Sequence, residues 1–153
     1  MDFELDADQL ELQANARGVV TGECPPALVR AVGSGDDDGG RFWKTLVGLG
    51  WPSLTIPVVD GGLGASTAEL GVVLEQLGYA ADPTPSLATM SHYVPVIREC
   101  APAGERSSLL RAVCDGGAGA VAFEASDVTV RRDGEGWVLD GTCLLYTSDA
   151  ADE

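Results

Sequence analysis

The stretch that decides the fold is residues 61–78, which read GGLGASTAELGVVLEQLG. Its first four residues form a glycine-rich run that is typical of a tight turn. Ser66, followed by Glu69 three positions later, forms a capping box and predicts the start of a helix. Four apolar side chains then recur at helical spacing: Leu70, Val73, Leu74 and Leu77. Gly78 ends the pattern, so the stretch predicts a turn followed by one amphipathic helix.

The glycine run also raises the question of a phosphate-binding turn, since helix N-termini bind phosphates. The run lacks the GxGxxG spacing of dinucleotide-binding proteins. Pro57 also interrupts the preceding residues 54–57, which are expected to be extended. A structural turn is therefore the favoured interpretation.

Three more helices are predicted upstream of this stretch. Asp6 and Gln9 have the spacing of a capping box at the start of the first helix. Pro25 ends that helix because proline cannot continue the hydrogen-bond ladder. A short helix over residues 26–32 and a longer one over about 41–49 follow.

Downstream of residue 78 the pattern changes from helical to extended. Thr84 and Pro85 begin a helix in which a kink is expected at Pro95, and another helix covers about 105–114. After residue 116 the chain has a short apolar run and then two segments in which apolar and polar residues alternate. These segments are joined by Asp133-Gly134, which is a hairpin signal.

The predicted fold class is α+β, with an N-terminal all-α helical bundle followed by the first strands of an antiparallel β-domain. The expected domains are 1–116 for the helical domain, 117–142 for the start of the β-domain, and a separate segment, 143–153. That last segment reads CLLYTSDAADE, which resembles one translated frame of a transposon adapter used in sequencing libraries. We interpret it as a non-native tail and expect the natural protein to be longer.

The composition excludes several classes of function. Hydrophobic residues make up 45% of the chain, so a packed core is expected. The net charge of -15 would repel a phosphate backbone, so no nucleic-acid partner is predicted. No apolar run approaches the roughly 20 residues that span a bilayer, so no membrane association is predicted. The acidic start of the chain is unlike a secretory signal, and a cytoplasmic protein is expected.

A metal site is not predicted. The four cysteines form no CxxC pair, and His92 is the only histidine. The acidic run 36–38 is interpreted as a solvated loop rather than as a set of metal ligands. His92 has no carboxylate or nucleophile placed by sequence to work with it, so it is interpreted as a packed or surface histidine rather than a general base.

The order and spacing of several short motifs resemble the acyl-CoA dehydrogenase family over almost all of residues 1–142. The motifs are Asp6 with Gln9, Gly50-Trp51, Ile56-Pro57, residues 61–64, residues 72–78, Leu109-Leu110 and residues 136–142. The resemblance implies an N-terminal helical domain, a middle β-domain and a C-terminal helical bundle. It also implies α,β-dehydrogenation of an acyl-CoA thioester, with a glutamate removing the α-proton and FAD accepting the hydride.

The resemblance also implies site residues. The strand along the flavin is expected to include Ala120, Ala122, Phe123, Glu124 and Ser126. The acyl pocket is expected to be lined by Leu87, Met90, Ser91 and Val94, a stripe that core packing would also explain. The catalytic glutamate would lie beyond Thr142, so no catalytic residue is predicted in this chain, which is expected to be inactive by itself. Electron-transfer flavoprotein or a similar acceptor, and a homo- or hetero-oligomer, are the implied partners.

Departures from the family pattern keep alternatives open. Phe123 stands where a threonine would meet the flavin, and Val58 and Val59 stand where acidic residues are usual. These changes suggest a divergent branch. The alternatives are a non-catalytic partner subunit of a two-gene dehydrogenase and a flavin monooxygenase of the same fold.

Overall fold

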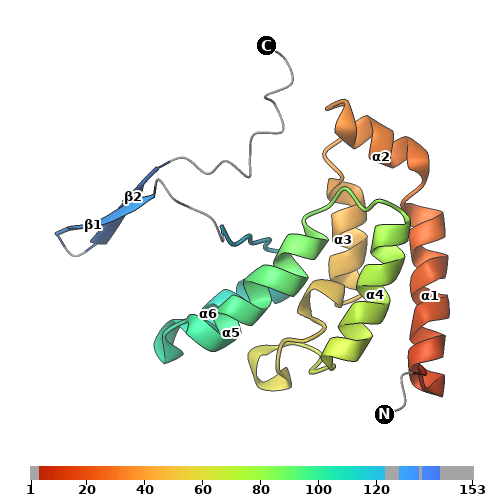
Figure 1. The fold of residues 1–153 in the computed structure, drawn as a ribbon, viewed down its shortest axis with the longest axis horizontal. Helices are drawn as coiled ribbons and strands as arrows, with labels where there is room; N and C mark the ends of the chain where they lie inside the picture. The colour runs from red at the N-terminus through yellow and green to blue at the C-terminus, as the bar shows by residue number, and fades with distance from the viewer. Residues whose placement is uncertain (1–3, 123–127, 135, 142–153) are drawn as a thin grey trace. The chain divides into compact units, whose positions relative to one another are not determined.

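The computed structural model describes residues 4–122, 128–134 and 136–141 (Figure 1). It divides into two compact units, Met1–Ala120 and Val121–Glu153. The described part of the first unit is helical, and that of the second contains an antiparallel hairpin. The predicted α+β class, a helical bundle followed by the first strands of a β-domain, is confirmed.

The first unit contains six α-helices and three shorter helical segments within its described residues. The α-helices are α1 (Ala7–Glu23), α2 (Pro26–Gly33), α3 (Gly40–Gly48), α4 (Thr67–Tyr79), α5 (Val94–Cys100) and α6 (Ala103–Cys114). The shorter segments are the 3-10 helices η1 (Trp51–Ser53) and η2 (Val58–Asp60) and the π-helix η3 (Ala88–Tyr93). No helix in the described residues is long and apolar enough to cross a membrane.

Both predicted capping boxes are present. The Gln9 N–H donates to Oδ1 of Asp6 at 2.8 Å, and the Asp6 N–H donates to Oε1 of Gln9 at 3.2 Å. At the start of α4 the Ser66 N–H donates to Oε2 of Glu69 at 2.7 Å, and the Ser66 hydroxyl accepts from the N–H of Ala68. Each box satisfies N–H groups that have no partner within the helix.

Helices α1 and α4 lie side by side and run parallel (Figure 1). Three side-chain hydrogen bonds connect them in the same order along both helices: Gln9 to Glu69 at 3.1 Å, Gln13 to Glu75 at 3.2 Å and Arg17 to Gln76 at 2.9 Å. Parallel neighbours cannot be joined by a short turn. The chain therefore returns through α2, α3 and the loop that follows before α4 begins.

Two hydrophobic clusters form the core of the helical unit. The larger lies among α1, α3 and α4 and includes Phe42, Leu46, Val73, Leu77 and Met90. The smaller lies where α5 meets α6 and consists of Ile56, Val94, Leu110 and Val113. Of the apolar stripe predicted on α4, Leu70, Val73 and Leu77 are buried, and Leu74 is half-buried against the larger cluster.

The extended conformation predicted for residues 54–57 is wrong at Leu54, which lies in a turn that continues from η1 with φ -51° and ψ -48°. The cause is the glycine loop, which returns to hydrogen-bond with this turn. Leu63, Gly64 and Ala65 donate their N–H groups to the carbonyls of Ser53, Ile56 and Leu54, at 3.2, 2.9 and 2.8 Å. Gly62 lies against Ile56 so closely that a Cβ would overlap its backbone, which explains the glycine at this position.

The hairpin of the second unit pairs β1 (Thr129–Asp133) with β2 (Gly136–Asp140). The register places Val130 opposite Leu139 and Arg132 opposite Trp137, so these four side chains share one face. Val130, Trp137 and Leu139 are all exposed within the described residues. Within the described residues this face therefore carries three exposed apolar side chains beside one arginine.

Candidate functional site

The π-helix η3 leads directly into α5, which has Pro95 near its start. Proline has no N–H and cannot donate to the carbonyl four residues earlier, that of Ser91. The helix accommodates this by widening just before the proline, and such π-turns often occur at functional sites. The widened turn alters which side chains share a face, because a π-helix has more residues per turn than an α-helix.

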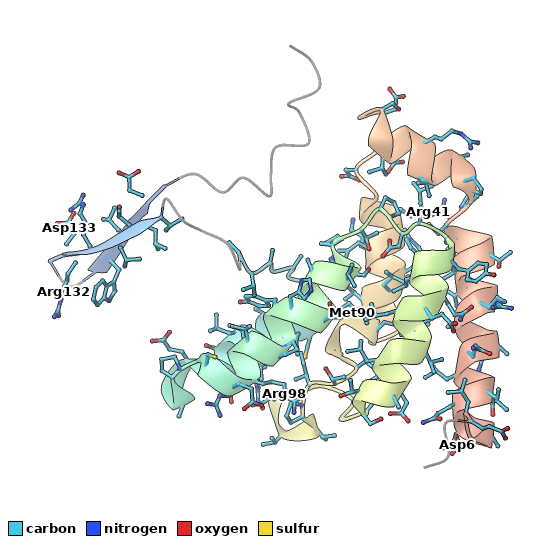
Figure 2. All side chains as sticks on the ribbon, in the orientation of Figure 1. Asp6, Arg41, Met90, Arg98, Arg132 and Asp133 are labelled. Atoms are coloured by element: carbon cyan, nitrogen blue, oxygen red, sulfur yellow. The ribbon has the colours of Figure 1, made fainter. Side chains whose placement is uncertain are left out.

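The four residues predicted to line the acyl pocket do not form one surface. Met90, labelled in Figure 2, and Val94 are 1% and 0% exposed and belong to the two different core clusters. Leu87 is 61% exposed. Ser91 is half-buried, and its hydroxyl donates to the carbonyl of Leu87 at 2.6 Å. Of the four, Ser91 and Leu87 line cavities in the described structure, and they line different ones.

The cavity that contains Ser91 has a volume of about 320 Å³ and lies between α4 and the η3–α5 helix. Leu70, Gly71 and Leu74 form its α4 wall, and Pro95 and Arg98 form the opposite wall. A Cβ built on Gly71 would meet no atom within 4 Å, so the absence of a side chain there keeps the cavity open. Arg98, labelled in Figure 2, is held by a hydrogen bond from Nη1 to the carbonyl of Thr55 at 3.1 Å.

A second, larger cavity of about 580 Å³ lies between the C-terminal ends of α1 and α4. Arg17, Val20, Cys24 and Tyr79 are among its lining residues, and the Arg17 guanidinium lies 5.5 Å from the centre of the Tyr79 ring. Burial, with a smaller effect from Asp82, raises the pKa of the Cys24 thiol. None of the predicted site residues lines this cavity.

A contact that the sequence did not reveal joins the π-helix to the chain just before the predicted flavin strand. Thr89 is fully buried, and its hydroxyl both donates to the Gly119 carbonyl and accepts from the Gly119 N–H, each at 3.2 Å. A Cβ on Gly119 would overlap the ring of Tyr93. Thr89 and Gly119 are 30 positions apart, so pattern analysis does not reveal the pair, and a glycine within an apolar run was the available signal.

The flavin-side strand is described only in part. Phe123, Glu124 and Ser126 lie outside the described residues. Ala120 and Ala122 are exposed. Within the described residues, both positions carry only a small methyl side chain.

Among the residues that the structure describes, no group of three or more histidine, cysteine or acidic side chains is placed to hold a metal ion. In the acidic run 36–38, side chains instead form hydrogen bonds with backbone N–H groups of the same loop. Asp37 and Asp38 accept from the N–H groups of Gly39 and Gly40, at 2.7 and 2.8 Å. The loop thereby leads into α3, as a turn of this kind does.

The two capped parallel helices and the glycine loop before α4 make up a helical domain. The model of the "Acyl-CoA dehydrogenase, N-terminal domain" family matches residues 6–117, and the chain belongs to the acyl-CoA dehydrogenase family. No curated protein matches the chain.

Three solved structures are similar. A variant of the Tcur3481-Tcur3483 steroid ACAD has a TM-score of 0.74 and 32% identity, with 90% of this chain and 40% of that chain covered. Another form of the Tcur3481-Tcur3483 steroid ACAD has a TM-score of 0.72 and 26% identity, with 94% and 41% covered. The ChsE4-ChsE5 complex from Mycobacterium tuberculosis shares the fold, with a TM-score of 0.73, 21% identity, and 92% and 39% covered. This chain therefore spans about 40% of the length of the steroid ACAD chains it matches.

Proposed function

We propose that this chain is the N-terminal part of an FAD-dependent acyl-CoA dehydrogenase that introduces an α,β double bond into an acyl-CoA thioester. The observation that carries the proposal is the family match over residues 6–117, joined to 32% identity with a steroid ACAD over 90% of the chain. In such an enzyme the flavin supplies the hydride acceptor. The 153 residues by themselves are expected to be inactive, with the catalytic glutamate outside them.

The chain's own part in this reaction is to bind and to orient. We assign one wall of the acyl site to the cavity between α4 and the η3–α5 helix, where Ser91 and Pro95 face Leu70 and Gly71. Its volume of about 320 Å³ lies at the lower end of the range of small-molecule sites. The apolar α4 side chains would exclude water from the acyl group. Ala120 and Ala122 would lie along the flavin, with Phe123, Glu124 and Ser126 continuing the strand.

The proposed substrate is a bulky, steroid-type acyl-CoA thioester, and the proposed assembly contains a second, different chain. Both parts rest on the similar structures, which are steroid ACADs named as pairs of proteins. Gly71 adds no side chain to the α4 wall of the acyl-side cavity. Electron-transfer flavoprotein or a similar protein is the proposed electron acceptor.

A second candidate function is that of a non-catalytic subunit that supports a catalytic partner. The observation in its favour is Phe123, which stands at the flavin strand where the family resemblance expects a threonine. An aromatic ring has no hydroxyl to offer the flavin.

The test is to express the full-length parent alone and together with the product of any adjacent homologous gene. We expect bound FAD and loss of the oxidised flavin absorbance when a steroid acyl-CoA is added without oxygen, with much less bleaching by a short-chain acyl-CoA. FAD and bleaching only in the presence of the partner's own intact site would support the non-catalytic subunit. A parent complex that binds no flavin would refute the dehydrogenase proposal.

A further inference from the structure

The cavity between the C-terminal ends of α1 and α4 has no part in the proposed function. Its volume of about 580 Å³ falls within the range of small-molecule sites, roughly 300–1,000 Å³. The residues described as lining it all belong to the first unit. None of them lines the cavity that we assign to the acyl group. The two cavities are therefore distinct.

Most of the described wall of this cavity is apolar. Two consecutive prolines between α1 and α2 stiffen it, because the proline ring fixes the backbone angle φ. Tyr79 adds an aromatic ring. The other apolar members of the wall are Val20, Cys24, Pro25, Pro26, Ala80 and Ala81. Such a wall favours contact with the apolar body of a ligand over contact with water.

Arg17 is the charged side chain among the residues described as lining the cavity. Two other lining residues hold its guanidinium at the wall. The Nε–H donates to Oε1 of Gln76 at 2.9 Å, and the guanidinium lies 5.5 Å from the centre of the Tyr79 ring. Arg17 forms no ion pair with any residue that the structure describes. Its two Nη groups can therefore bind a carboxylate through two parallel hydrogen bonds.

The acidic side chains beside the cavity already have partners. Three acidic residues adjoin lining residues in the sequence, and their pairs are Glu23 with Arg41 at 3.6 Å, Glu75 with Gln13 at 3.2 Å and Asp82 with Thr84 at 2.9 Å. Burial, with a smaller effect from Asp82, raises the pKa of the Cys24 thiol, so the thiol is neutral near neutral pH. In a chain with a net charge of -15, the described wall thus presents an arginine without an acidic partner.

The helix ends around the cavity carry partial charges of both signs. Helices α1 and α4 end there, and helix C-termini disfavour anions, whereas α2 begins there, at Pro26, without a side-chain cap (Figure 1). On α4, the carbonyl of Leu77 already accepts from the N–H groups of Ala80 and Asp82, at 3.2 and 3.0 Å. Arg17 carries the full charge in this setting, so it decides the sign of the ligand.

We propose that this cavity binds a small-molecule carboxylate with an apolar body, whose carboxylate pairs with Arg17 and whose body lies along the proline-containing wall. The inference goes beyond the proposed function, because it needs neither a flavin nor an acyl-CoA. Gln76 and Tyr79 hold the guanidinium before any ligand arrives, so less side-chain entropy is lost on binding than for a free arginine.

The test is isothermal titration calorimetry of the 153-residue chain with two carboxylates, cinnamate and decanoate, whose apolar bodies are flat and flexible, respectively. We expect at least one of them to bind with a dissociation constant below about 1 mM. Its neutral counterpart, cinnamyl alcohol or decanol, should bind at least about tenfold more weakly. Arg17→Met should raise the dissociation constant of the carboxylate by about tenfold or more, and Arg17→Lys, which keeps the charge, by less.

Two further variants locate the site. Thr21→Trp adds bulk at the cavity from the exposed side of α1 and leaves Arg17 in place, so it should also raise the dissociation constant by about tenfold or more. Arg41→Met is the matched control, because Arg41 lines none of the described cavities. It should keep the dissociation constant within about twofold of wild type. If Arg17→Met does not fold, Thr21→Trp and the neutral counterparts decide the matter.

The proposal is overturned if neither carboxylate binds, if acid and alcohol bind equally well, or if Arg17→Met and Thr21→Trp leave the affinity unchanged. A chain that binds neither probe and forms a dimer that Arg17→Met dissociates would instead assign the cavity to an interface between copies of this chain. None of these outcomes bears on the dehydrogenase proposal, which is tested by flavin binding to the full-length parent.

Discussion

The Nε–H of Arg17 donates to Oε1 of Gln76 at 2.9 Å, which ties together the C-terminal halves of α1 and α4 across 59 residues of sequence. The Gln76 side chain is 1% exposed, and its amide nitrogen donates to Glu75 at 2.9 Å. Arg17 therefore supplies the hydrogen bond that a buried acceptor requires. It also covers one face of the Tyr79 ring.

Arg17→Met should lower the free energy of unfolding by about 1–2 kcal/mol, because it keeps an apolar stem and leaves the Gln76 oxygen without its donor. Urea denaturation of the 153-residue chain measures this. Arg41→Met is the control, since the Arg41 side chain is 90% exposed and its ion pair with Glu23 is 3.6 Å long (Figure 2). That change should cost less than about 0.5 kcal/mol. Equal losses in the two variants would contradict the role given to Arg17.

Glu69 should make stability depend on pH. The Ser66 hydroxyl, the Gln9 amide and the Ser66 N–H lower the pKa of Glu69 from 4.5 to about 2. Because the pKa is lower in the folded state, the carboxylate contributes stability that is complete above about pH 4.5 and is lost as the pH falls toward 2. Glu69→Gln should therefore be less stable than wild type by about 1 kcal/mol at neutral pH, after allowance for solvent screening.

The measurement for Glu69 is urea denaturation of wild type and variant at several pH values between 7 and about 2.5. The difference between them should shrink as the pH falls. Ser66→Ala removes the Ser66 hydroxyl, the first of the three donors. It should also reduce the dependence of the free energy of unfolding on pH. A difference that stays constant across this range would show that the carboxylate is not stabilised by the cap.

Gly62→Ala should be among the most damaging single changes in the helical unit. A Cβ at this position overlaps the backbone of Ile56, which cannot move without breaking the turn, so the expected loss is about 3 kcal/mol or more. Gly18→Ala is the control, and its expected effect on stability is the opposite. It lies inside α1 with no atom within 4 Å of an added Cβ, and should stabilise the protein by about 0.5–1 kcal/mol. Thermal denaturation of both variants checks the pair.

Gly71→Met should test the proposed acyl wall. The added side chain would enter the cavity lined by Leu70 and Ser91 and would raise the KM for a steroid-type acyl-CoA by about tenfold or more, with less effect on a short acyl-CoA. Steady-state kinetics of the full-length parent provide the measurement. Gly22→Met, on an exposed part of α1, should leave both substrates unaffected. An unchanged KM for the bulky substrate would exclude this cavity from the acyl site.

The cysteines should differ in reactivity. Burial, the larger cause, and Asp82 raise the pKa of Cys24, so little thiolate forms there near the ordinary thiol pKa of about 8.5. Cys100 is exposed. Alkylation followed by peptide mass spectrometry should label Cys100 first and Cys24 only after denaturant is added. Similar labelling rates in the native chain would show that the end of α1 opens readily.

The helix ends could be predicted from sequence because their causes are local. Asp6 with Gln9, and Ser66 with Glu69, lie three residues apart and form their hydrogen bonds without help from the rest of the fold. The hairpin was predictable for the same reason, since Asp133-Gly134 marks its turn. Leu54 was not, because its conformation depends on the glycine loop returning to it.

The arrangement of the four residues expected to line the acyl pocket could not be predicted from sequence for a different reason. Its prediction assumed α-helical spacing, under which Leu87, Met90, Ser91 and Val94 share one face. The widened turn from Ala88 to Tyr93 breaks that spacing and sends Met90 and Val94 into separate clusters. Thr89, which the stripe omitted, contacts Gly119 instead. A sequence pattern interpreted with the α-helical period alone does not detect a local change from α-helix to π-helix.

The parallel pairing of α1 with α4 also has a consequence during synthesis. Gln76 leaves the ribosome 59 residues after Arg17, and at ~5–20 residues per second this delay is roughly 3–12 s. For that interval Ala16 and Val20 lack the α4 members of the hydrophobic cluster to which they belong. The nascent first helix is therefore a site where a chaperone could bind until its partner has been translated.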